Sequence, residues 1–342
     1  MAQAAAVFAA CGCGSNGASP TQGHGDAASE RSAPPTPYAR PDYQRLSGTE
    51  LFADIDARVP GPGVTAFEPT YKLWSDGADK RRWIRLPPGT QIDSTDMDHW
   101  VFPIGTKLWK EFSRDGVLLE TRLIERYGEG PDDYWMGAFA WEADQSDAVF
   151  VVDGQKDIAG TIHDAPAQKD CDVCHRGDVG RVLGFSAVQL SGPTSAAVPA
   201  GPKLADLKAM DLLSHPPAEG GYPVPGDADT AQALGYLHAN CGHCHNKNGT
   251  AWHDTQMVLR LRVADSAANT LEVCASILAG KLQYWRGGAI TMRVAPGQPD
   301  ASAIVARMQI RGSDDQMPSL ATELVDPTGL ATLRRWIAAL GP

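Results

Sequence analysis

The sequence predicts an α+β protein in which a Trp-rich antiparallel β domain precedes a mostly α-helical domain. Two features of the chain indicate this order. Six of the nine Trp residues lie between positions 70 and 165, among short β-like runs separated by Gly, Pro and Asp. From residue 165 onward the pattern changes to short helices joined by loops rich in Gly and Pro. A length of 342 residues is sufficient for both parts to bury a core.

The charge balance argues against a nucleic-acid-binding protein. The formal net charge is −11, and Lys and Arg do not gather into the basic stripe that phosphate contacts need. The chain has no apolar run long enough for a membrane-spanning helix, and its 43% hydrophobic and 21% charged residues are typical of a globular protein. An acidic surface favours either a basic partner or simple solubility.

Residues 1–41 are predicted to be the remnant of a signal sequence followed by a flexible tether. A short apolar run ends in small residues immediately before Cys11, as in bacterial lipoprotein signals, although the basic residues that usually begin such a signal are missing. Gly, Ser and Pro are frequent in residues 12–41, which therefore cannot pack. We expect a periplasmic or cell-envelope protein with a membrane tether through lipidated Cys11. The alternative is an Ala-rich terminus with an incidental Cys.

The predicted β domain spans residues 42–165. A short capped helix is expected at residues 47–58, before the strands begin. The β-like runs lie at residues 83–86, 100–102, 107–112, 118–124 and 149–152. The Trp side chains have two interpretations. They either pack in the core of a sheet, which is the commoner role, or form a stacking platform for a sugar or another ligand.

The second part, residues 166–342, is expected to contain several short helices. They are predicted at residues 204–213, 230–240, 302–310 and 327–340. The last of them has the clearest start, because Asp326 is suited to cap it and Pro327 to occupy its first position. The helix predicted at residues 230–240 runs directly into a motif rich in Cys and His.

Two Cys-x-x-Cys-His pentads account for four of the seven Cys residues. They are Cys171-Asp172-Val173-Cys174-His175 and Cys241-Gly242-His243-Cys244-His245. The pentad is the attachment site of c-type haem, and two copies are not expected by chance. A thioredoxin-like dithiol is disfavoured because a helix, not a strand, is predicted before Cys241. A zinc ribbon is disfavoured because Cys174 and Cys241 lie much farther apart along the chain than the Cys pairs of a ribbon. Covalent haem is the favoured interpretation, and a zinc site or a redox dithiol is the alternative.

The pentad has the spacing that haem attachment requires. Two Cys sulfurs one helical turn apart each bond one vinyl group, and the adjacent His becomes the proximal ligand of the iron. The sequence therefore predicts two covalently bound haem c groups, the first held by residues 166–225 and the second by residues 226–342. The first is assigned to Cys171, Cys174 and His175, and the second to Cys241, Cys244 and His245.

The remaining axial ligands are predicted less completely. Met317 is expected to be the distal ligand of the second haem, because it lies in a Pro-containing loop shortly before the last helix. Met308, nine residues earlier, is better explained as a core residue. The first haem has no single candidate. Its distal ligand is either one of four side chains, Met136, His163, Met210 and His215, or an open position that binds a small molecule.

Several further motifs resemble a bacterial family of secreted or lipid-anchored di-haem c-type cytochromes. The motifs lie at residues 73–80, 102–106, 119–123 and 144–148, and in the pairs Arg307-Met308 and Met317-Pro318. The resemblance extends from about residue 70 to the C-terminus, and it implies a Trp-rich β region followed by a cytochrome c-like di-haem domain. The physiological role of the family is not established. Ser319 stands where the family commonly has a second Pro, which leaves the ligand in place within a looser loop.

These observations predict a periplasmic di-haem c-type cytochrome that transfers single electrons between redox partner proteins, which the sequence does not identify. Two alternatives remain open. The first is a peroxidase-like di-haem enzyme with an open position on the first haem. The second is a binding protein that grips its ligand with the Trp-rich domain. No phosphate loop, nicotinamide fingerprint or Ser-His-Asp motif is seen, and Cys13 and Cys274 have no assigned role.

Overall fold

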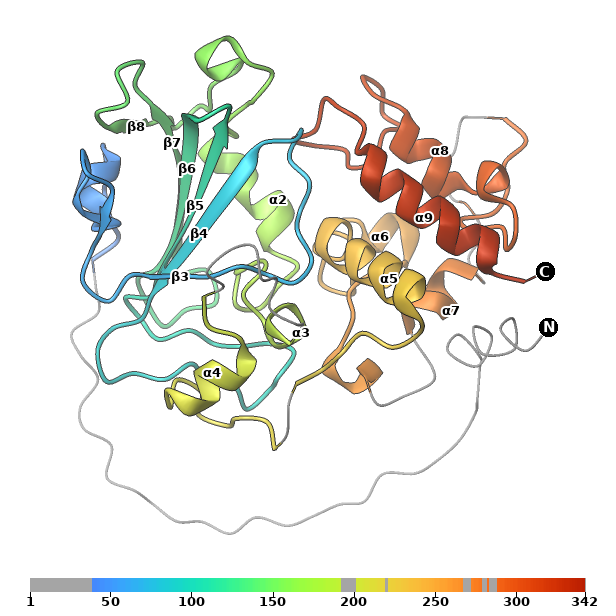
Figure 1. Cartoon of the computed structure of the whole chain (residues 1–342), viewed down its shortest axis with the longest axis horizontal. Helices are drawn as coiled ribbons and strands as arrows, with labels where there is room; N and C mark the ends of the chain where they lie inside the picture. The colour runs from blue at the N-terminus through green and yellow to red at the C-terminus, as the bar shows by residue number, and fades with distance from the viewer. Residues whose placement is uncertain are drawn as a thin grey trace.

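The computed structural model describes residues 39–191, 201–218, 221–266, 272–278, 282 and 288–341. Within these ranges the protein has the predicted mixed α+β fold (Figure 1). The main antiparallel sheet occupies one side of the molecule in Figure 1, and α5, α8 and α9 occupy the other, with α2 between them. Cys11, Cys13 and the predicted tether up to residue 38 lie outside the described residues. Within the described ranges, no helix has both the length and the apolar character needed to cross a bilayer.

The main sheet is a six-stranded antiparallel meander in which each strand pairs with the next one along the chain. Four of the predicted β-like runs fall within it, whereas the run at residues 100–102 makes only an isolated bridge at Val101. The sequence interpretation missed β7. The strands are β3 (Thr65–Ala66), β4 (Asp79–Arg85), β5 (Lys107–Arg114), β6 (Val117–Arg126), β7 (Tyr134–Trp141) and β8 (Ala148–Phe150).

One face of this sheet carries the tryptophan core. Trp83 pairs with Trp109, which in turn pairs with Leu123, so these side chains lie in one row on the same face. Trp135 and Trp141 join them, and all four Trp side chains are buried. The core interpretation of these four Trp residues is therefore correct.

The expected helix at residues 47–58 is wrong. The chain instead forms a 3-10 turn, η1 (Leu46–Thr49), and a small hairpin of β1 (Phe52–Asp54) and β2 (Val59–Pro60). Glu50 adopts a left-handed backbone with φ of 69°, which ends the turn. This path places Leu46 and Leu51 against the tryptophan core, where both are fully buried. Tertiary burial has therefore overridden the local helix signal.

The chain beyond residue 150 contains all the described α-helices, and they are short. The α-helices are α2 (Cys171–His175), α3 (Ala187–Leu190), α4 (Leu204–Ala209), α5 (Ala228–Asn240), α6 (Trp252–Thr255), α7 (Glu272–Leu278), α8 (Ala303–Gln309) and α9 (Pro327–Ala339). The 3-10 helices are η2 (Ile158–Gly160), η3 (Gln168–Asp170), η4 (Val263–Ser266) and η5 (Pro299–Ala301). The predicted helix at residues 204–213 ends early, at Ala209, and Asp211 has a left-handed φ of 56°.

The longest helices, α5 and α9, pack directly on each other. Asp326 caps α9 as predicted, because its carboxylate accepts a hydrogen bond from Gly329 N at 2.9 Å, and Pro327 occupies the first turn. Gly329 allows the closest approach of the two helices, since a Cβ atom at this position would lie 2.2 Å from the ring of Tyr236 on α5. Leu234, Leu237, Leu333 and Trp336 complete the buried contact.

Replacing Gly329 with Ala is expected to destabilise the protein. Ala favours a helix interior over Gly by about 1 kcal/mol, but the added methyl group must displace the Tyr236 ring. Overpacking of this kind costs about 1–3 kcal/mol in the free energy of unfolding. Chemical denaturation measures the change. Gly48→Ala is the control, because a Cβ atom there meets open space. A stabilised Gly329→Ala protein would contradict the close packing of α5 and α9.

Candidate functional site

All seven predicted site residues line two large cavities. The first cavity has a volume of about 740 Å³, and Cys171, Cys174 and His175 of α2 lie in its wall. The second has a volume of about 640 Å³ and is lined by Cys241, Cys244, His245 and Met317. Both volumes fall in the range of cofactor sites, roughly 300–1,000 Å³. Each pentad therefore opens onto its own cavity.

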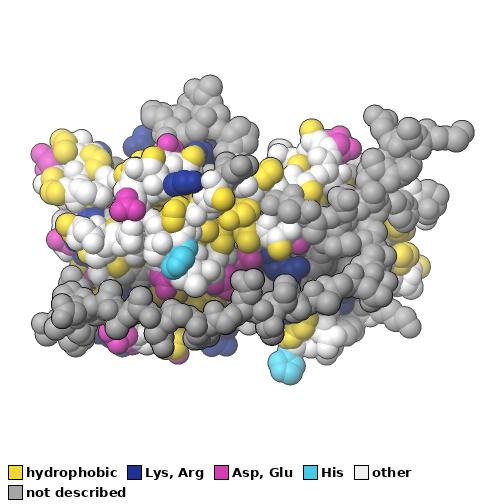
Figure 2. Space-filling model, turned by 90° about the horizontal axis from the view of Figure 1, so that it is seen from below, with side chains coloured by type: hydrophobic (Ala, Val, Ile, Leu, Met, Phe, Trp, Pro, Cys, Tyr) yellow, Lys and Arg dark blue, Asp and Glu magenta, His cyan; other side chains and the backbone are white. Residues whose placement is uncertain are grey.

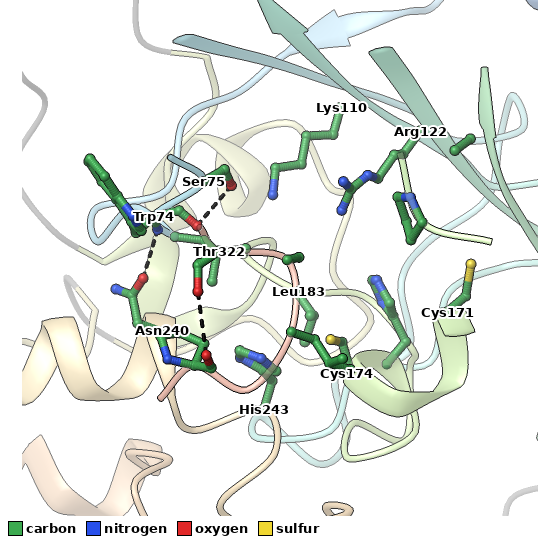
Figure 3. Close-up of a pocket in the computed structure, with 18 of the residues that line it drawn as sticks. Trp74, Ser75, Lys110, Arg122, Cys171, Cys174, Leu183, Asn240, His243 and Thr322 are labelled. Atoms are coloured by element: carbon green, nitrogen blue, oxygen red, sulfur yellow. Dashed lines mark hydrogen bonds between the residues drawn. The ribbon is translucent and has the colours of Figure 1, made fainter. Parts of the chain in front are cut away.

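The first cavity lies between α2 and the sheet. Figure 3 shows Cys171 and Cys174 on one side of it, with Lys110 and Arg122 extending toward it from the strands. The backbone of η3 continues directly into α2, and this places the two Cys side chains one helical turn apart. Cys171 and Cys174 thus meet the spacing that a pair of thioether bonds requires.

His175 is held in one ring orientation. Its Nδ1 lies 2.6 Å from the carbonyl oxygen of Arg181, an acceptor, so Nδ1 must carry the proton. The lone pair is then on Nε2. Burial is the main reason that the pKa of His175 lies below its usual value. A neutral imidazole whose Nδ1–H is bonded to a backbone carbonyl is the usual state of a metal-ligating His.

His245 has the same arrangement in the second cavity. Its Nδ1 lies 3.3 Å from Thr255 Oγ1, and that hydroxyl donates its own proton to Ala251 O at 2.8 Å. Thr255 Oγ1 therefore accepts from Nδ1–H, and Nε2 of His245 is again left with the lone pair. Burial lowers the pKa of His245 to about 4, so the ring is neutral near neutral pH.

Three Met residues line the second cavity: Met257, Met308 and Met317. Met308 is buried in the same cluster as Leu333 and Trp336, which agrees with its interpretation as a core residue. Met317 lies in the loop between α8 and α9, and its N–H donates to Arg307 O at 3.0 Å. The placement of Met317 in the cavity wall is compatible with its predicted role as a distal ligand.

The four candidate distal ligands of the first haem separate into two groups. Met136 and His163 line the first cavity. His163 is already engaged, since its Nε2 lies 2.8 Å from a carboxylate oxygen of Glu120. Met210 is 54% exposed, and neither it nor His215 is part of the cavity wall. Of the four candidates, Met136 and His163 are therefore the two that the structure places in the cavity wall.

The two cavities adjoin, which the sequence does not predict because the pentads are far apart along the chain. The residues common to both walls are Cys174, Asn240, His243, Pro318, Ser319 and Leu320. Cys174 Sγ, Cys244 Sγ and a ring nitrogen of His243 all lie within 4.8 Å of one another. One Cys from each pentad thus stands at the junction, and the same three groups could hold a metal ion.

The four pentad thiols have different environments. Burial raises the pKa of Cys171 to about 11 and that of Cys241 to about 12. A hydrogen bond from Cys244 lowers the pKa of Cys174 and raises that of Cys244 itself. In a thioredoxin-like dithiol the first Cys of the pair is the acidic nucleophile. Here burial raises the pKa of the first Cys of each pentad, and the lowered pKa belongs to Cys174, the second Cys of its pentad.

A short segment before β4 connects the sheet to both cavities. Asn240 is the last residue of α5, just before Cys241, and its Oδ1 accepts a hydrogen bond from Trp74 N at 2.7 Å (Figure 3). Asn240 Nδ2 donates to Lys72 O at 3.1 Å. The carboxylate of Asp76 accepts hydrogen bonds from the backbone N–H groups of Glu323 and Leu324 at 2.8–3.0 Å. The family resemblance includes this segment, but its structural role was not predicted.

Comparisons of this chain with family models, with curated proteins and with solved structures found no match. The assignment of the two cavities therefore depends on the residues and geometry of this chain.

Removing the Asp76 carboxylate is expected to loosen the loop that follows Met317. Asp76→Ala loses hydrogen bonds from two backbone N–H groups to a buried charge, a loss of about 1.5–3 kcal/mol in the free energy of unfolding. Asp76→Asn keeps one acceptor oxygen and should lose less. Hydrogen exchange at Glu323 and Leu324 should accelerate in the Ala variant. The control is Asp79→Ala, at an exposed position three residues away. Equal losses at Asp76 and Asp79 would contradict this role.

Proposed function

We propose that this protein is a di-haem c-type cytochrome that transfers single electrons in the bacterial cell envelope. The observation that carries the proposal is that each pentad lines a cavity of cofactor size and presents a neutral His whose lone pair is on Nε2. The donor set also fits, because two Cys sulfurs and one imidazole in this spacing are the attachment set of haem c. A zinc site or a dithiol would not need either cavity.

The residues that line each cavity indicate which side chains would hold each haem. Cys171 and Cys174 supply the thioether sulfurs in the first cavity, and His175 supplies the proximal ligand. Cys241, Cys244, His245 and Met317 take the corresponding roles in the second. When bound, haem c supplies exchange of one electron between ferrous and ferric iron. Burial keeps both imidazoles neutral and therefore able to ligate.

The shared wall favours electron passage between the two sites. Cys174 and Cys244 belong to different pentads, yet their sulfur atoms lie within 4.8 Å of each other. Groups attached to these sulfurs would therefore be neighbours. Electrons entering at one site would leave at the other, toward redox partner proteins. Among the described residues on the face in Figure 2, Lys and Arg side chains occur together with Asp and Glu side chains.

The proposal includes three features that the sequence motifs suggest. Residues 166–342 form a mostly helical, cytochrome c-like domain in which the two groups supply much of the core. The chain belongs to the lipid-anchored di-haem family that its motifs resemble. Residues 1–41 are a signal remnant and tether, and Cys11 carries the lipid. The order of elements supports the first feature, since every described α-helix follows the sheet.

A second candidate function is metal binding at Cys174, His243 and Cys244. The observation that favours it is the cluster of these three side chains. A zinc site with three protein ligands keeps an open fourth position, as in zinc enzymes, whereas structural sites have four ligands. This candidate leaves Cys171, Cys241 and the free Nε2 atoms of His175 and His245 without a role, so the haem proposal explains more of the site.

The haem content is expected to follow the pentads one by one. Protein expressed with the haem attachment machinery should carry two haems, one for each pentad. Replacing both Cys171 and Cys174 with Ser should leave one, and replacing Cys241 and Cys244 as well should leave none. The pyridine haemochrome assay counts the haems, and the intact mass detects both thioether-linked haem and any acyl chain on Cys11. The control is His253→Ala, at an exposed His outside both pentads, which should retain both haems.

Two results would contradict the haem proposal. The first is a colourless mature protein that contains one zinc ion by elemental analysis, which would support the cluster of Cys174, His243 and Cys244 instead. The second is a coloured protein whose haem extracts completely into acidified organic solvent, since a thioether-linked haem remains with the chain.

Met317→Lys is expected to lower the reduction potential of the second haem and to abolish the near-infrared band of Met-ligated ferric haem. The reason is that Met ligation raises the potential relative to a harder nitrogen ligand. Redox titration and near-infrared absorption measure the two effects. Met308→Leu is the matched control, because Met308 lines the same cavity but packs in the core. Loss of the band in the control alone would make Met308 the ligand.

A further inference from the structure

Three cationic side chains form a row across the sheet where it faces the first cavity. Arg82 on β4 pairs with Lys110 on β5, and Lys110 pairs with Arg122 on β6. Directly paired residues project from the same face, so the three side chains lie side by side opposite the tryptophan core. All three line the first cavity, and Lys110 and Arg122 can be seen extending toward it in Figure 3.

Only one of these three charges is balanced within the described part of the chain. Arg122 donates to both carboxylate oxygens of Glu120, at 2.7 and 2.9 Å, and Glu120 is also bonded to His163. Within the described residues, Arg82 and Lys110 have no carboxylate within ion-pair distance. Lys110 Nζ instead lies 5.0 Å from the ring centroid of Phe112.

The buried and half-buried carboxylates near the cavity already have other partners. Asp76 accepts from the backbone of the loop after Met317, and Asp164 is paired with Lys156. Glu68, the acidic group that acts on Arg82 at longer range, forms an ion pair with Lys72. The described part of the chain therefore does not supply the row with a second anion.

This arrangement is unfavourable unless an anion binds. Like charges directly opposite on neighbouring strands repel each other, and a buried charge without a partner loses its hydration. Arg82 is only 6% exposed, and burial lowers its pKa to about 10. Burial, together with Arg82 and Arg122, also lowers the pKa of Lys110. Unpartnered cations that face a cavity are typical of a binding site.

We propose that Arg82 and Lys110, with Arg122 beside them, bind a carboxylate or similar small oxyanion in the first cavity. The anionic group comes either from the propionates of the first haem, in which case the inference rests on the proposed function, or from a free anion. A free anion held beside the first haem would make this cavity a ligand-binding or reaction site. The second cavity would then serve electron transfer only.

The test uses the holoprotein and two variants of the row, Arg82→Gln and Lys110→Met. Arg81→Gln is the matched control, because Arg81 is adjacent on the same strand but exposed on the opposite face. Lys110→Arg keeps the charge and is expected to behave like the parent, which separates loss of charge from misfolding. The haem content of each sample is counted first, so that failure of the proposed function is recognised separately.

In the first arm, nitrite is titrated at constant ionic strength and its binding is followed by calorimetry and by the haem spectrum. If the anion is free, nitrite binds the parent, and its affinity falls by roughly tenfold or more in Arg82→Gln and Lys110→Met, as expected for one lost charge-assisted hydrogen bond. Its affinity stays within about twofold of the parent in Arg81→Gln, because that charge faces away from the cavity.

In the second arm, resonance Raman spectra of the propionate bending modes are compared among the same proteins. If the haem supplies the anion, nitrite does not bind, and these modes shift in Arg82→Gln and Lys110→Met but not in Arg81→Gln. The proposal is overturned if neither nitrite binding nor the propionate modes depend on Arg82 and Lys110, or if Arg81→Gln has the same effect. In a haem-free preparation, calorimetry with nitrite still tests the cation row, and absence of binding overturns it.

Discussion

The structure depends on the hydrogen bonds that join residues 72–76 to two distant segments. Asn240 at the end of α5 is bonded to the backbone of Lys72 and Trp74, and Asp76 holds the backbone of Glu323 and Leu324. Asp76 adopts a left-handed φ of 50° to reach that loop. Because β4 begins a few residues later, these bonds fix the strands relative to α5 and to the loop that follows Met317. The segments joined in this way contribute to the walls of both cavities.

The local features of the fold could be predicted from the sequence, because short-range chemistry determines them. The cap of α9 by Asp326 and the course of α5 into the second pentad were predicted correctly. β7 was missed because it is almost entirely apolar and does not alternate, and because Gly137 interrupts it. In the structure Gly137 leaves room for the rings of Trp135 and Phe150. The prediction of a helix at residues 47–58 was wrong for the opposite reason. The local sequence favours a helix, but burial of Leu46 and Leu51 in the tryptophan core requires a different backbone path.

In the candidate site, too, the local motifs could be predicted from the sequence, whereas the features that depend on tertiary structure could not. The pentads and Met317 are local motifs, and the structure places all of them in cavity walls. The proximity of Cys174 and Cys244 could not be predicted, because it depends on how the turn after α5 lies against α2, which is distant along the chain. The row of Arg82, Lys110 and Arg122 depends on strand register, which the sequence does not specify in advance. The position of Met210 and His215 outside the cavity wall also could not be predicted, because both lie at suitable distances along the chain.

The loop of Pro318, Ser319 and Leu320 borders both cavities, and it follows Met317 directly. On its C-terminal side it continues through Glu323 and Leu324, which Asp76 holds, into α9. Any displacement of this loop on one side changes the volume available on the other. If the two cavities hold haem as proposed, a shift of this loop on filling of the first cavity would change the shape of the second, and the two sites would not be mechanically independent. Under that proposal, a protein with haem at only one pentad would differ in the geometry of that site from the protein with both haems.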